Sequence, residues 1–147
     1  RLLHGSLDNI HRRTKKKKMK IEVTELDTSL TTNFVNFCCD DLGVFPDFIT
    51  VEGWDEPFNN GALGLCYEVD AKEDYLIMVS KEGRNVTQIY NTIAHEMIHV
   101  KQFMVQNLSK NLCQEHKPLY RDRWWEKEAK ENSFDMVKRY VDILMKI

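Results

Sequence analysis

Residues 85–108, NVTQIYNTIAHEMIHVKQFMVQNL, carry the pattern that decides the fold prediction. Apolar side chains recur there at intervals of three and four residues, which is the spacing of one face of an α-helix. They are Val86, Ile89, Tyr90, Ile93, Met97, Val100, Met104 and Leu108. Asn85 is a residue type that often caps a helix N-terminus. The pattern therefore predicts one long helix from Asn85 to about Leu108.

The middle of this helix reads His95-Glu96-Met97-Ile98-His99, an HExxH motif. Residues four apart on a helix project from one face, so both imidazoles can reach one metal ion, with Glu96 beside the water on that ion. On a helical wheel the two histidines project away from the apolar stripe. The polar residues on their side are Gln88, Asn91, Thr92 and Gln102. We expect these side chains to line a wet cleft; the alternative is two histidines on a solvated helix face.

A catalytic zinc site needs a third protein ligand besides two histidines and keeps one position for water. The downstream candidates for this ligand are Glu115, His116, Asp122, Glu126, Glu128 and Glu131. A second long helix is predicted from about Trp124 to Met145, after a polar connection over residues 109–123. The last three candidates lie on this helix, so its wheel discriminates among them.

Glu126 falls on the apolar face of the second helix, whereas Glu128 and Glu131 fall among charged residues. An ionised carboxylate that faces a core is costly unless a counter-charge or a metal ion pairs with it. A metal ion held by the two motif histidines is the simplest partner for Glu126. An ion pair with Arg121 or Arg123 is the alternative. We expect Glu128 to behave as a surface residue.

Upstream of the motif the apolar pattern changes. Residues 28–42 have helical spacing and end before Gly43, which is typical of a helix C-terminus. Short runs with strand-like composition precede and follow this helix. They cover residues 20–23, 48–51, 62–69 and 75–80. The sequence therefore predicts an α+β fold, in which a small antiparallel or mixed sheet packs on the HExxH helix and on the second, C-terminal helix.

The composition indicates one globular domain over residues 19–147. Of the 147 residues, 42% are hydrophobic and 30% are charged. No apolar run approaches the roughly 18 residues that span a bilayer, so we expect no membrane partner. Residues 1–18 hold seven basic residues and one acid, Asp8, without a folding pattern. We expect a basic flexible arm or a cloning remnant there; nucleic-acid contact by this segment is the less favoured alternative.

The four cysteines do not have the spacing of a zinc knuckle or of a disulfide framework. Cys38 and Cys39 are adjacent, while Cys66 and Cys113 are distant in the sequence. We expect reduced, mostly buried thiols, which are typical of an intracellular protein. The first residues also contain no apolar region of a signal peptide. Both observations favour a cytoplasmic location.

An HExxH helix, followed by a glutamate that opens the next helix with a small residue three positions on, resembles the gluzincin metallopeptidases. The second segment here is Glu126-Lys127-Glu128-Ala129. The short length and the Trp-Glu-x-Glu-Ala string ending at Ala129 are most similar to small minigluzincin-like proteins of phage or prokaryotic type. The resemblance implies a minimal zincin-like fold and, for a phage-encoded chain, the host cytoplasm as its location.

The same resemblance implies roles for individual residues. The implied Zn²⁺ ligands are His95, His99 and Glu126. Glu96 would act as the general base, Tyr120 would stabilise the oxyanion, and the strand over residues 62–69 would pair with an extended substrate. One position departs from the family pattern, because Lys130 replaces an aspartate that orients a zinc histidine. Another residue of this chain must then orient that histidine.

Together these features predict a zinc-dependent metallopeptidase that hydrolyses a peptide or protein through a metal-activated water. Three alternatives stay open. An SprT-like or IrrE/ImmA-like metalloprotease acting around DNA would suit the basic arm and could take His116 as its third ligand. A virion-associated or interaction module would keep the zinc site without catalysis. A latent protease would block its cleft with its own N-terminal segment. The oligomeric state is left open.

Overall fold

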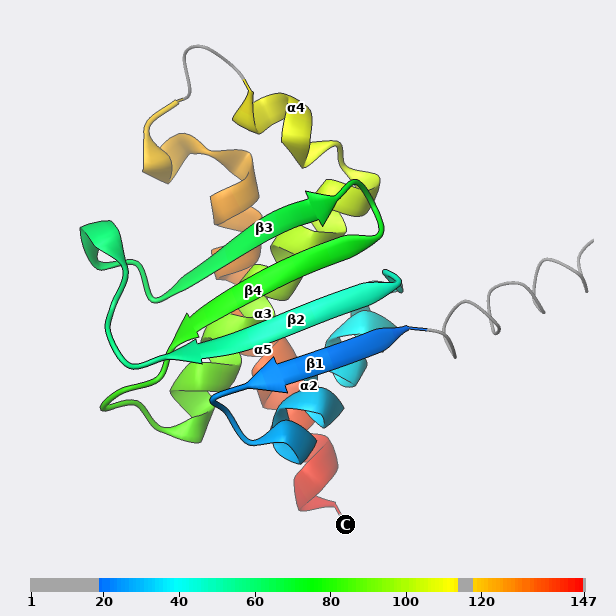
Figure 1. Cartoon of the computed structure of the whole chain (residues 1–147), viewed down its shortest axis with the longest axis vertical. Helices are drawn as coiled ribbons and strands as arrows, with labels where there is room; N and C mark the ends of the chain where they lie inside the picture. The colour runs from blue at the N-terminus through cyan, green and yellow to red at the C-terminus, as the bar shows by residue number, and fades with distance from the viewer. Residues whose placement is uncertain (1–18, 114–117, 147) are drawn as a thin grey trace, which may run out of the picture.

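The computed structural model describes residues 19–113 and 118–146, without the side chain of Arg121. The segment predicted to form a basic arm, residues 1–18, lies outside the described residues. Two of the candidate third ligands, Glu115 and His116, also lie outside them. The described chain is α+β, with strands and helices in the order that the sequence predicted (Figure 1).

In the described chain, four strands form one mixed sheet (Figure 1). They are β1 (Lys20–Thr24), β2 (Phe48–Trp54), β3 (Gly64–Asp70) and β4 (Asp74–Ser80). The spatial order is β1-β2-β4-β3, and β1, β2 and β4 run parallel. β3 pairs antiparallel with β4, because a tight turn joins the two strands, and it forms one edge of the sheet. The prediction of a small antiparallel or mixed sheet is therefore confirmed in its mixed form.

Three long helices cover one face of the sheet, as Figure 1 shows. They are α2 (Thr28–Leu42), α3 (Val86–Val105) and α5 (Trp124–Met145). β2 and β4 alternate buried and partly exposed side chains, as strands with one covered face do. α3 contacts β3, β4, α2 and α5, so it is the central helix of this layer. None of the described helices is long and apolar enough to cross a membrane.

The predicted start of the motif helix is confirmed, but its predicted end is wrong. Asn85 caps α3, because its side chain accepts from the Gln88 backbone N–H at 2.9 Å and Gln88 Oε1 accepts from the Asn85 N–H. The helix ends at Val105, since Asn107 adopts a left-handed backbone with φ of 57°. Leu108 begins a separate short helix, α4 (Leu108–Leu112), and is buried there. The apolar periodicity continued past the helix end because both segments pack on one core.

The connection between α3 and α5 was predicted to be a polar linker over residues 109–123. Its described parts contain most of α4 and a short 3₁₀ turn, η2 (Tyr120–Asp122). α2 has the predicted bounds, and Gly43 ends it with φ of 70°. An aromatic cluster joins the three long helices: Phe34 of α2 stacks on Tyr90 of α3 at 4.5 Å between ring centroids and meets Tyr140 of α5 at 5.0 Å.

The edge strand β3 approaches α3 closely at Gly64. A Cβ atom on Gly64 would lie 2.5 Å from Cγ2 of Thr92 and 3.0 Å from Oε2 of Glu96. Only glycine therefore allows this spacing between the strand and the helix. As a result, the first residue of β3 lies directly beside the glutamate of the HExxH motif.

We expect Gly64→Ala to destabilise the fold by roughly 1–3 kcal/mol, because the added methyl group overpacks the strand against the helix. Thr92→Ser removes the methyl group that the new Cβ would meet and keeps the hydroxyl that Arg84 contacts. The double variant should therefore recover most of the loss in urea unfolding. Equal stability of Gly64→Ala and the unmodified chain would contradict the close approach.

Candidate metal centre

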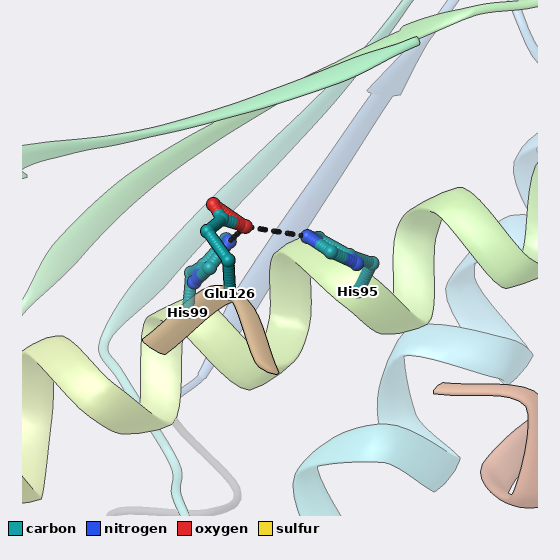
Figure 2. Close-up of side chains that lie close together, drawn as sticks. All are labelled: His95, His99 and Glu126. Atoms are coloured by element: carbon teal, nitrogen blue, oxygen red, sulfur yellow. Dashed lines mark hydrogen bonds and ion pairs between the residues drawn. The ribbon is translucent and has the colours of Figure 1, made fainter. Parts of the chain in front are cut away.

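Three side chains of the predicted metal site converge in the structure (Figure 2). His95 and His99 project from α3, one turn apart, and Glu126 projects toward them from the first turn of α5. Glu126 Oε1 lies 2.9 Å from His95 Nε2 and 3.0 Å from His99 Nε2. The exposed fractions of the three side chains are 22%, 9% and 14%, respectively. The site is thus enclosed but open on the side of His95.

The arrangement fits a small tetrahedral cation. The ligand atoms of the three residues lie within 4.8 Å of one another. Zinc bonds of about 2.0–2.1 Å in tetrahedral geometry separate neighbouring ligand atoms by about 3.3 Å. The nitrogen–oxygen distances in the structure are shorter by only a few tenths of an ångström. Two imidazole nitrogens and one carboxylate oxygen are also the donor set of catalytic zinc sites.

Gln102, one turn after His99 on α3, fixes the orientation of the His99 ring. The Gln102 amide nitrogen donates to the Trp125 carbonyl at 2.9 Å and to Glu128 Oε1 at 3.1 Å. Its amide oxygen therefore faces His99 Nδ1, at 2.7 Å, and can only accept. His99 must donate from Nδ1, which leaves the lone pair of the neutral ring on Nε2. That lone pair is directed at the carboxylate of Glu126.

Two acceptors that face each other at 3.0 Å need a positive charge between them. A proton on His99 Nε2 or a metal ion can supply it. Burial lowers the pKa of His99, but the hydrogen bond to Glu126 and the charge of Glu96 outweigh burial, so the net shift is upward. For Glu126 burial acts in the other direction and raises the pKa. The hydrogen bonds and charges of the two histidines outweigh burial and hold the pKa of Glu126 well below its usual value. The geometry therefore stabilises a cation at this position.

Glu96 lies beside the cluster without belonging to it. It is buried on α3, and its carboxylate borders Gly64 at the start of β3. Burial raises the pKa of Glu96, the charges of His99 and His95 lower it, and Glu126 raises it further. A buried carboxylate with a raised pKa is suited to accept and release a proton.

The cleft above the cluster has two parts, which share His95, Glu96 and Tyr120. The smaller part has a volume of about 250 Å³ and is lined on its far side by apolar groups. They include Leu65, Phe103, Leu108, Leu112 and Trp125. The larger part, of about 580 Å³, contains polar side chains that the smaller part lacks. They include Arg84, Gln88, Asn91, Thr92, Lys130 and Ser133.

Three of the four residues that the helical wheel predicted to line a cleft do so. Gln88, Asn91 and Thr92 line the larger hollow. Gln102 does not, because it is fully buried beneath the metal cluster. Its role was missed in the sequence, although its spacing of three residues from His99 on the same helix face was a usable signal.

The structure brings Tyr120 to the cleft as well. It lies in η2 with an exposed fraction of 57% and borders both hollows. Burial of part of its side chain and the charge and hydrogen bond of Glu126 raise the pKa of its hydroxyl. The hydroxyl therefore remains a proton donor at the edge of the cluster.

The expectation that Glu128 is a surface residue is wrong. Its carboxylate accepts from Gln102 and from Gln106, at 3.1 and 3.3 Å, and pairs with Lys101 at 3.7 Å. The aspartate expected from the resemblance is absent at Lys130, and the described contact to His99 comes from a different pair of residues. Gln102 contacts the histidine, and Glu128 holds Gln102. The wheel failed here because α5 packs on α3 over more than its apolar stripe.

Of the two arginines proposed as partners of Glu126, only Arg123 has a described side chain, and it forms no ion pair with Glu126 there. Arg123 donates from Nε to the Pro118 carbonyl and lies over the Tyr120 ring rather than against Glu126. The side chain of Arg121 is outside the described residues. Among the described histidines, cysteines and acids, the ligand group consists of His95, His99 and Glu126, without Asp122 or Glu131.

A scan against protein-family models finds no matching family, and searches of curated proteins and of solved structures find no match. The functional argument therefore rests on the residues of the site and on their geometry.

Gln102→Leu tests the support of the site without metal. Leucine is similar in size but leaves His99 Nδ1 and the Trp125 carbonyl without their buried partner. We expect a loss of roughly 2 kcal/mol or more in urea unfolding of the metal-free protein, since each such group costs about 1–3 kcal/mol. Gln106→Leu is the matched control and should lose less, because Gln106 donates only one long hydrogen bond, of 3.3 Å, to Glu128. Equal losses would refute the assigned role of Gln102.

Proposed function

We propose that this protein is a zinc-dependent metallopeptidase with a minimal zincin-like fold of the gluzincin type. The observation that carries the proposal is the lone pair of His99 Nε2, directed at the Glu126 carboxylate beside His95. A proton could satisfy this pair. It would not explain why the third ligand atom, His95 Nε2, also lies against the Glu126 carboxylate, or why a buried acid, Glu96, lies beside the three ligands. A zinc ion explains all four groups.

When bound, zinc supplies a Lewis acid and lowers the pKa of a water molecule to about 7. The residues of the chain perform the remaining steps. Glu96 accepts the proton of the attacking water and returns it to the leaving amine. The Tyr120 hydroxyl donates a hydrogen bond to the carbonyl oxygen as it becomes negative. Gln102 keeps the ring of His99 in the tautomer that leaves Nε2 free.

The edge strand β3 supports a peptide as the substrate. Within the described residues its outer edge is unpaired in the sheet order β1-β2-β4-β3, so its backbone groups can pair with an added strand. Gly64 and Cys66 line the cleft above the metal cluster. An extended peptide bound along β3 therefore passes over Glu96 and the two histidines. A cytoplasmic location remains part of the proposal.

We expect one zinc ion per chain after purification without chelator, measured by elemental analysis. Glu126→Ala should lower zinc affinity by orders of magnitude, because it removes the only anionic ligand. Glu128→Ala should retain zinc but weaken it about tenfold to hundredfold, since Glu128 holds Gln102. Glu131→Ala is the control on the exposed face of α5 and should bind zinc like the unmodified chain. Well under one zinc per chain, without uptake of added zinc, would overturn the site.

Glu96→Gln tests catalysis separately from metal binding. We expect it to keep the fold and the zinc and to lose at least about a hundredfold in peptidase rate, because the general base is gone. Glu131→Gln carries the same chemical change on an exposed side chain and should keep full activity. Undiminished cleavage by Glu96→Gln would exclude Glu96 as the base. A zinc-loaded chain that cleaves no member of a broad peptide library would favour the non-catalytic module.

A further inference from the structure

The two parts of the cleft differ in charge. The smaller hollow is bordered by the acids Glu96 and Glu126 and continues from them with apolar side chains. The larger hollow contains two basic residues, Arg84 and Lys130, and its one acidic lining residue is Glu96 at the shared boundary. A substrate that fills both parts therefore meets a positive environment on one side of the reacting bond only.

Arg84 is held rigidly in this hollow. Its guanidinium donates to the Ser80 carbonyl at 2.7 Å, to the Gln88 carbonyl at 3.1 Å and to Thr92 Oγ1 at 2.6 Å. These neutral acceptors fix its position but leave its charge uncompensated, and it pairs with no carboxylate among the described residues. A guanidinium has five N–H groups, so donors remain for a ligand.

Two further groups in the hollow are without partners in the described structure. Lys130, on the side of α5, forms no ion pair there. Asn91 lines the hollow from α3, and its Oδ1 atom is buried without a hydrogen bond in the described structure. The unpaired charge of Lys130 adds to that of Arg84, so this part of the cleft favours an anionic ligand.

The direction of β3 determines which part of a peptide enters the hollow. The hollow lies at the start of β3, beside Gly61 and Gly64, whereas the apolar hollow extends to Leu65 and Cys66 further along the strand. Antiparallel pairing is the more stable arrangement for an added strand. An antiparallel peptide runs from the end of β3 toward its start. The residues after the cleaved bond therefore lie beside Arg84 and Lys130.

We propose that the larger hollow binds a carboxylate group of the substrate on the C-terminal side of the cleaved bond. This inference rests on the proposed peptidase function and adds its substrate class. The substrates are peptides in which the residue directly after the cleaved bond either is acidic or is the last residue and carries the free C-terminal carboxylate. Arg84 donates a remaining N–H group to the carboxylate, and Lys130 adds a second positive charge. The apolar hollow takes an aliphatic or aromatic side chain before the bond.

Binding of uncleaved peptides tests this specificity, with zinc-loaded Glu96→Gln protein and fluorescence anisotropy. The peptides share an apolar residue before the bond and carry, after it, Glu with an amidated C-terminus, Gln with an amidated C-terminus, or Gln with a free carboxylate. We expect at least one carboxylate peptide to bind about tenfold tighter than the neutral peptide, as for a hydrogen bond to a charged group. The two carboxylate peptides identify the source of the charge. Equal affinities of all three would overturn the inference.

Charge-altering variants assign the preference to the hollow. Lys130→Glu should abolish the carboxylate preference and favour a peptide with Lys after the bond. Arg84→Gln keeps a polar side chain near Thr92 and should reduce the carboxylate preference. Lys127→Gln changes an exposed charge on α5 outside the cleft and should leave the preference intact. A preference that survives both variants of the hollow would also overturn the inference.

Cleavage by the active, zinc-loaded chain separates this inference from the proposed function. If the unmodified chain cleaves the neutral and carboxylate peptides at equal rates and binds them equally, the peptidase function stands and the carboxylate site fails. If it cleaves no peptide but still binds the carboxylate peptides more tightly, the peptidase function fails and the hollow remains a carboxylate site.

Discussion

The packing of α3 between the edge strand β3 and the helix α5 is the constraint on which the rest of the structure depends. Glu126 is 27 and 31 residues from the two histidines in sequence, yet its carboxylate reaches both imidazoles. It does so because α5 runs along α3 and begins at the level of the motif. Gly64 meets the same helix from the other side, so the site is enclosed between strand and helix.

The polar groups beneath the candidate metal centre are accommodated within the helix layer. Glu96, His99 and Gln102 are buried in a mostly apolar helix layer. Gln102 joins His99 to Glu128 and to the backbone of α5, so both side chains have hydrogen-bond partners. Burying a network of this kind costs desolvation free energy. Its hydrogen bonds fix the orientation of the side chains, which metal ligands require. The apolar cluster of α2, α3 and α5 supplies the stability on which this arrangement relies.

The cleft also has a chemical polarity that follows from the topology. β3 runs opposite to the other strands, so its start lies beside the N-terminal half of α3, near Asn91 and near Arg84, which precedes the helix. Its later residues lie beside the apolar hollow, which Phe103 of α3 and Leu108 of α4 line. One strand thus passes from a basic to an apolar environment across the histidine pair. The cleft is suited to a ligand with a carboxylate at one end and an apolar group at the other.

The sequence by itself determined the three long helices, apart from the end of α3, and the spacing of the two histidines. Apolar spacing predicted α2, the start of α3 and the whole of α5, because amphipathic period and capping are local properties. It also placed Glu126 on the buried face of α5. Only the tertiary structure decided that Glu128 is part of the site, that Gln102 orients His99, and that the sheet is mixed. These depend on which surfaces of α3, α5 and β3 meet, and no local pattern specifies a contact between residues that the fold brings together from distant positions.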